Sequence, residues 1–198
     1  TREKNCLNNS YRGKIDWNVK GVQIMNKLWG HFKTITAHKL AVTKLCFRCG
    51  LYKQGLLHDL SKYTPVEFCA GVKYFQGNRS PIDYEKEVKG YSLGWLHHKG
   101  RNKHHWEYWL DNAVGGIRPV KMPLHYLVEM YCDRTAASRI YMKENYHDGS
   151  AYEYFMNGYD NVIMHEETKA MLKMILEYQR NHGTDATVDF IRKEILKN

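Results

Sequence analysis

Apolar residues recur three and four positions apart along most of this 198-residue chain, and this spacing restricts the chain to helices. A half-buried strand would instead alternate apolar and polar residues, and we find no such segment, internal repeat or low-complexity stretch. The sequence therefore predicts an all-α, helical-bundle protein. The clearest stripe indicates a helix that ends near Gly50, and its members are Ile24, Leu28, His31, Ile35, His38, Val42 and Leu45.

Turn and capping residues divide the rest of the chain into further helices. Thr64, Pro65 and Glu67 have the pattern of a capping box with proline at the first helical position, which predicts a helix from there to about Gly77. The tail is expected to form two amphipathic helices that meet at Gly183. The other predicted helical segments are 51–62, about 83–99, the region through Trp106 and Trp109, and about 123–142.

No stretch has the composition of a linker, so we interpret residues 1–198 as one domain. Its core is predicted at about 24–140, with C-terminal packing helices at about 150–198. The 43% hydrophobic content offers enough apolar surface to offset the entropy of ordering the chain.

Charge and cysteine content narrow the possible partners and location. The formal net charge of +9 favours an anionic partner such as a phosphorylated metabolite, a nucleotide or nucleic acid, although a solvated basic surface explains it equally well. The odd, scattered cysteines do not form a disulfide scaffold, so we expect a cytoplasmic protein, and no apolar run is long enough to span a membrane. These cysteines are Cys6, Cys46, Cys49, Cys69 and Cys132, of which the Cys46–Cys49 pair is interpreted as structural.

Histidines and aspartates on predicted helices form the strongest functional signal. His38 lies on one core stripe, His58 and Asp59 are adjacent, and Asp133 shares the buried face of a later helix. A buried carboxylate needs a cation and a buried imidazole needs a polar partner. We therefore predict that these four residues converge on a metal ion. His31 lies on the same stripe as His38 but has no such neighbours in the pattern, so it is expected to be a core histidine.

Two histidine pairs, His97–His98 and His104–His105, lie between these segments. One interpretation makes them a surface cluster around tryptophans that are themselves core residues: Trp95, Trp106 and Trp109. The other interpretation places some of the histidines beside the metal, with the intervening basic run bringing a cation close to it.

The order His, His-Asp, His, His, Asp resembles that of the HD superfamily, which comprises helical metal-dependent phosphohydrolases. The stretch GLLHDLSKYTPVEF is the strongest local match, and WLHHKGRNKHHWEYW resembles the histidine-rich insert of binuclear branches. Together with EMYCDRTAAS, they make the chain similar to an uncharacterised family of small HD-like bacterial and phage proteins. The resemblance covers about 24–140. The two histidine pairs of this chain are closer together than those of the binuclear enzymes.

The resemblance implies a role for each matching residue. His38, His58, Asp59 and Asp133 would hold a metal, and His98 with His104 or His105 would hold a second one, whereas His97 should face elsewhere. Asp59 would bridge or orient the attacking water, and Lys62, the lysine of the H-D-x-x-K pattern, would face the substrate phosphate. Arg101 and Arg134 are candidate phosphate clamps, because a guanidinium group binds two oxygens at once.

Nitrogen and carboxylate ligands without a thiolate suit manganese, iron, cobalt or nickel, with magnesium also admissible, better than structural zinc. The predicted function is a metal-dependent hydrolase acting on a phosphate ester or nucleotide through a metal-activated water. One alternative is a binuclear iron oxygenase on the same fold. The other is a non-catalytic nucleotide or nucleic-acid binding protein stabilised by metal, which we favour less because no nucleic-acid motif is recognisable.

Overall fold

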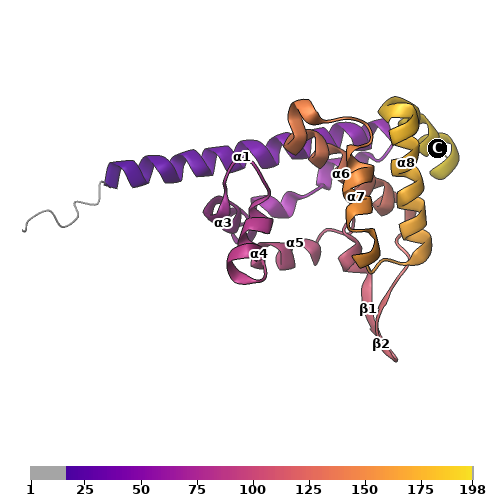
Figure 1. Ribbon diagram of the computed structural model, residues 1–198, viewed down its shortest axis with the longest axis horizontal. Helices are drawn as coiled ribbons and strands as arrows, with labels where there is room; N and C mark the ends of the chain where they lie inside the picture. The colour runs from indigo at the N-terminus through magenta and orange to yellow at the C-terminus, as the bar shows by residue number, and fades with distance from the viewer. Residues whose placement is uncertain (1–16, 198) are drawn as a thin grey trace, which may run out of the picture.

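The computed structural model describes residues 17–197, and most of them are helical, which confirms the predicted all-α class (Figure 1). The α-helices are α1 (Trp17–Arg48), α2 (Tyr52–Leu57), α3 (Pro65–Tyr74), α4 (Pro81–Lys89), α5 (Leu93–Lys99), α6 (Leu124–Met142), α7 (Ser150–Asn157) and α8 (Glu166–Phe190). The shorter elements are η1 (Leu60–Tyr63), η2 (Trp106–Trp109), β1 (Leu110–Ala113), β2 (Gly116–Pro119), η3 (Lys143–Asn145), η4 (Tyr159–Asn161) and η5 (Ile191–Ile195).

Helix α1 has 32 residues and is about 48 Å long. Its C-terminal half packs against α2 and α6, its middle contacts α3, and its first turns extend beyond the rest of the protein (Figure 1). The predicted stripe is buried from His31 to Leu45. The prediction is wrong at Ile24, which is 58% exposed, because the residues from 21 to 27 all lie in the exposed part of the helix.

Helix α6 lies at the centre of the hydrophobic core. Its residues Leu127 and Tyr131 pack with Val42 of α1 and with Leu172 and Ile175 of α8. All five side chains are at most 1% exposed. Helices α7 and α8 therefore complete the core around α6 and hold it against α1. The predicted break in the tail is present, because Gly183 has a positive φ of 81° that interrupts α8.

The segment 51–62 differs from the single helix that was predicted. Helix α2 ends at Leu57 and η1 begins at Leu60, and Asp59 between them has a left-handed backbone with φ 53°. Aspartate tolerates this conformation better than most residues with a Cβ atom. The consequence is a sharp turn at His58 and Asp59, which places both side chains in the interior of the protein.

Two further expectations about the middle of the chain need correction. The helix predicted over 83–99 is in fact α4 and α5, separated at Gly90, whose φ is 80°. Helix α3 begins at Pro65 as predicted, but its capping box does not form. The Thr64 hydroxyl donates to the carbonyl of Ser61 (2.6 Å), and Glu67 contacts histidines instead of the helix start.

The segment after η2 forms a β-hairpin, which was not predicted from the sequence. Strands β1 and β2 are antiparallel, with Leu110 opposite Pro119 and Ala113 opposite Gly116, and they project from the helical body (Figure 1). Val114 and Ile117 are 96% and 70% exposed. Because the hairpin has no buried face, its residues do not alternate between apolar and polar, which is why the pattern search missed it.

Among residues 17–197, no helix combines the length and the apolar composition that crossing a bilayer requires.

Candidate metal centre

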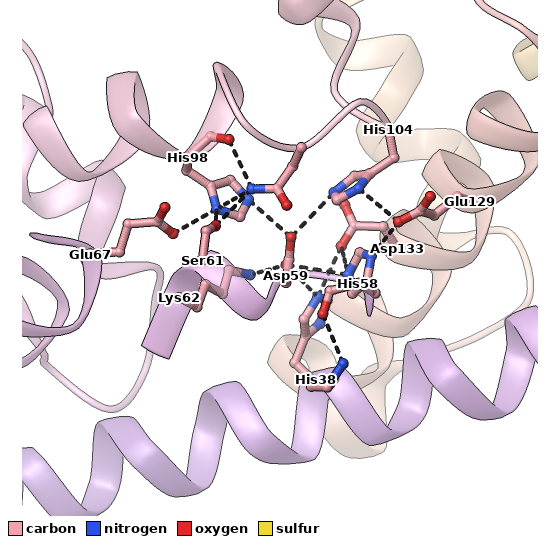
Figure 2. A network of polar contacts seen from close by, with 12 residues as sticks. His38, His58, Asp59, Ser61, Lys62, Glu67, His98, His104, Glu129 and Asp133 are labelled. Atoms are coloured by element: carbon pink, nitrogen blue, oxygen red, sulfur yellow. Dashed lines mark hydrogen bonds and ion pairs between the residues drawn. The ribbon is translucent and has the colours of Figure 1, made fainter. Parts of the chain in front are cut away.

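Five parts of the chain meet at a buried polar centre (Figure 2). Helix α1 brings His38, the turn between α2 and η1 brings His58 and Asp59, and α6 brings Asp133. Helix α5 brings His98, and the loop after it brings the second histidine pair. The predicted convergence of widely separated residues is therefore what the structure shows.

The first group of possible ligands is the set predicted from the sequence: His38, His58, Asp59 and Asp133. One atom from each lies within 4.8 Å of the others. The His38 Nε2 is 2.9 Å from the Asp133 Oδ1, and the His58 Nε2 is 3.2 Å from the Asp59 Oδ2. Two imidazoles and two carboxylates at this spacing are able to coordinate one cation.

A second group lies beside the first and consists of Asp59, His98, His104 and His105, again with atoms within 4.8 Å of one another. The Asp59 Oδ1 is 3.2 Å from the His98 Nε2 and 3.4 Å from the His104 Nε2. Asp59 therefore belongs to both groups, and its two oxygens face different groups. His97 belongs to neither, in keeping with the expectation that it faces elsewhere.

Glu129 orients one histidine of each group and was missed by the sequence reasoning. Its Oε1 is 2.9 Å from the His58 Nδ1 and 3.0 Å from the His104 Nδ1 (Figure 2). When a carboxylate accepts from Nδ1, the Nε2 of the same ring is left for a metal. A signal was present, because Glu129 lies four residues before Asp133 and so on the same face of α6.

Glu67 does the same for the histidine pair on α5. Its Oε1 is 2.6 Å from the His97 Nδ1, and its Oε2 is 2.7 Å from the His98 Nδ1. His97 thus helps to position Glu67, and Glu67 fixes the ring of His98. The sequence pattern assigned Glu67 to a capping box, so its contacts with the two histidines were not predicted.

The centre contains buried polar atoms that lack hydrogen-bond partners. His58, Asp59, His98 and His104 are each at most 2% exposed. The Nε2 atoms of His58, His104 and His105 and the Oδ1 of Asp59 are buried without a hydrogen bond within the described structure. Buried polar groups are rarely left unpaired, because desolvation is costly. These atoms belong to the two ligand groups, so their arrangement fits a bound cation.

The electrostatics of the centre also favour positive charge. Burial alone would raise the pKa of Asp59, but His58, Lys62 and His98 hold it well below its usual range. Burial lowers the pKa of His58, yet Asp59, Asp133 and Glu129 raise it well above the ordinary value. The carboxylates thus stabilise charge on the neighbouring imidazoles, and a divalent cation would benefit from the same field.

The three predicted substrate-binding cations lie in different surroundings. The Lys62 Nζ is 2.7 Å from the Asp59 Oδ2, so the lysine contacts the centre directly. Arg101 is exposed and donates to the carbonyl of His97 (3.3 Å). The Arg134 guanidinium carbon lies 5.3 Å from the ring centre of Phe155. Phosphate binding by the two arginines stays a prediction.

The residues interpreted as structural lie in apolar surroundings. The ring of His31 packs against Phe68 and Phe75, with centroids 5.4 and 5.9 Å apart. Three cysteines are free thiols that are fully buried in the core: Cys46, Cys49 and Cys132. Cys6 lies outside the described residues.

The fold and the site together define an all-helical protein with a buried histidine and carboxylate centre that could hold metal ions. The chain belongs to DUF5662, a family of unknown function whose sequence model matches residues 27–178. The matched range includes every residue of the centre. No curated protein and no solved structure shows significant similarity to the chain.

Proposed function

We propose that this protein is a metal-dependent hydrolase of a phosphate ester, with two divalent cations held on either side of Asp59. The observation that carries the proposal is that two adjacent four-residue ligand groups share this one carboxylate. A pair of cations close together is a common device for phosphate-ester hydrolysis. The resemblance of the HD and histidine-rich segments to HD phosphohydrolases adds to this support.

The donor set decides which metals suit the centre. Imidazole nitrogens and carboxylate oxygens without a thiolate favour manganese, iron, cobalt or nickel, and magnesium is admissible. When bound, the cations would lower the pKa of a water molecule and neutralise charge on the phosphate. His38, His58 and Asp133 would hold one cation with Asp59. His98, His104 and His105 would hold the other.

The chain's own residues would prepare the centre for an anionic substrate. Glu67 and Glu129 fix the orientation of three histidines. Burial alone would lower the pKa of Lys62, but Asp59 and Asp133 raise it above the usual value, so the side chain remains an ammonium. This cation is placed to neutralise phosphate charge that increases during the reaction.

Solvent reaches the centre on the Lys62 side. The side chains of Lys62 and Asp133 are 24% and 15% exposed, whereas those of Asp59, His98 and His104 are 2% exposed. A substrate would therefore approach between Lys62 and Asp133, and the deeper histidines would stay dry. A purely structural metal needs neither an open side nor a lysine ammonium beside it.

Chelation tests this proposal. We expect protein loaded with manganese to hydrolyse at least one member of a panel of phosphomonoesters and nucleotides, to lose the activity on dialysis against a chelator, and to regain it when manganese is returned. Asp59→Ala protein, purified in parallel, measures contaminating phosphatase.

Failure of every ester with verified, metal-loaded and folded protein would contradict the hydrolase proposal. If the protein as purified instead contained two iron ions per chain and consumed dioxygen, the oxygenase alternative would replace the hydrolase proposal. If metal removal changed only the melting temperature, the centre would be structural.

A further inference from the structure

A row of exposed apolar side chains follows one face of α1. Val22, Trp29, Leu40 and Phe47 succeed one another at intervals of seven and eleven residues, and each interval returns an α-helix to within about 20° of the same direction. Their exposed fractions are 59%, 55%, 63% and 36%. At 1.5 Å per residue, the row is about 38 Å long, so it covers most of the helix.

Helix α2 extends this row at its end. The ring of Tyr52 lies 5.3 Å from that of Phe47, and Leu56 follows Tyr52 by four residues on the same face of α2. These two additional side chains are 62% and 59% exposed. Single exposed apolar residues are common, but a continuous row of large ones marks an interaction surface. We call the six residues the apolar band: Val22, Trp29, Leu40, Phe47, Tyr52 and Leu56.

The segment that carries the band has almost no negative charge. Between residues 21 and 66, Asp59 is the only acidic residue, and it is 1% exposed inside the candidate metal centre. The surface of this segment therefore carries positive charge alone. Its basic residues are Lys27, Lys33, Lys39, Lys44, Arg48, Lys53 and Lys62.

Exposed lysines lie directly beside the band. Lys33 follows Trp29 by four residues, and its Nζ is 5.3 Å from the centre of the indole ring. Lys44 follows Leu40 by the same interval, so each lysine points about 40° away from its apolar neighbour. On α2, the exposed Lys53 adjoins the band in sequence. The band thus has ammonium groups along its edge.

This combination of features favours lipid over other anionic partners. Lysines beside a row of aliphatic and aromatic side chains are typical of helices that lie in the plane of a bilayer interface. Acyl chains would cover the band, while the lysine stems extend to the headgroup phosphates. Nucleic acid would pair with the lysines but leave the aliphatic side chains without apolar contacts. A second copy of the chain would bring lysines together with no exposed carboxylate between them.

We propose that α1 and α2 dock the protein on an anionic membrane surface, with the apolar band at the boundary between headgroups and acyl chains. A helix in this position lies on the bilayer, so it does not need the length and hydropathy that spanning requires. This inference is independent of the hydrolase proposal, because it uses no residue of the metal centre.

Sedimentation of the full chain with lipid vesicles tests the inference. We expect binding to vesicles of phosphatidylcholine mixed with phosphatidylglycerol, little binding to phosphatidylcholine alone, and weaker binding as salt is added. Lys33→Gln combined with Lys44→Gln should weaken binding by about 30-fold, because one lysine near an anionic surface typically contributes about fivefold. Trp29→Gln combined with Leu40→Gln should weaken it by at least about tenfold, since fully burying one large apolar side chain contributes about that much.

The β-hairpin region provides matched controls, because it projects away from α1 (Figure 1). Val114→Gln with Ile117→Gln removes two exposed apolar side chains, and Lys103→Gln with Lys121→Gln removes two exposed lysines. Both controls should bind as the wild type does. All four substituted α1 residues are exposed, so the variants should fold, and melting curves verify this.

Wild-type protein that stayed in solution with the mixed vesicles would overturn the inference. Vesicle binding that both α1 variants retained in full would do the same, because another surface would then be responsible. A wild type that dimerised without binding vesicles, together with a monomeric Trp29→Gln and Leu40→Gln variant, would assign the band to self-association instead.

Discussion

Asp59→Ala should reduce bound metal to background and abolish hydrolysis. Asp59 is the one residue common to both four-residue ligand groups, so its loss removes a ligand from each. A metal present at 100 times its dissociation constant stabilises the folded state by about 2.7 kcal/mol. For a chain of this length, that energy corresponds to a gap of roughly 5–10 °C between metal-loaded and chelated protein. The wild type should show this gap and the variant should not.

Asp148→Ala provides the matched control for this variant. The Asp148 carboxylate accepts a hydrogen bond from Thr184 (2.7 Å), far in sequence from the ligands, so its loss should lower the melting temperature without removing metal. Elemental analysis and thermal melting on both variants separate loss of metal from general instability. Normal metal content in Asp59→Ala would place this residue outside the site.

Lys62→Ala should slow hydrolysis by about 100-fold, or about 2.7 kcal/mol of transition-state stabilisation, and keep the metal. A protonated lysine binds no metal, and its removal leaves the Asp59 Oδ2, now 2.7 Å from the ammonium, available to a cation. The cost should therefore fall on kcat. Lys62→Arg, which retains the positive charge, should recover part of the rate.

Lys89→Ala is a suitable comparison because Lys89 also pairs with a buried carboxylate, at 2.8 Å from Glu85, but lies on α4 and away from the ligands. It should change the rate much less than Lys62→Ala. An unchanged rate in Lys62→Ala would reduce Lys62 to an ion-pair partner of Asp59. Loss of metal in that variant would show that Lys62 holds the centre together, which is a different role from the one proposed.

The predicted ligands could be found from the sequence because helical periodicity determines whether a side chain points toward the core or toward solvent. His38 shares a stripe with buried Val42 and Leu45, and Asp133 shares a face with buried Met130, so both had to point inward. The helix that carries Asp133 was also predicted close to its observed bounds, and the helix that carries His38 close to its observed end. Periodicity is therefore sufficient where a side chain lies on a long amphipathic helix.

Local backbone geometry and contacts between distant segments could not be read in the same way. The left-handed Asp59 breaks a segment whose composition suits a helix, and only the packing around it explains why that conformation is retained. Glu67 satisfies two histidines about 30 residues away, a pairing that no local pattern encodes. The exposure of Ile24 likewise depends on which elements reach the start of α1.

The central claim is that the buried centre holds divalent metal, and elemental analysis of the wild-type protein tests it most directly. The protein should be purified without chelator after growth with added manganese or iron. Two adjacent ligand groups predict at least one divalent transition metal per chain and two at full occupancy. A folded protein that contained no such metal, and that took up none when manganese or iron was supplied, would contradict the account.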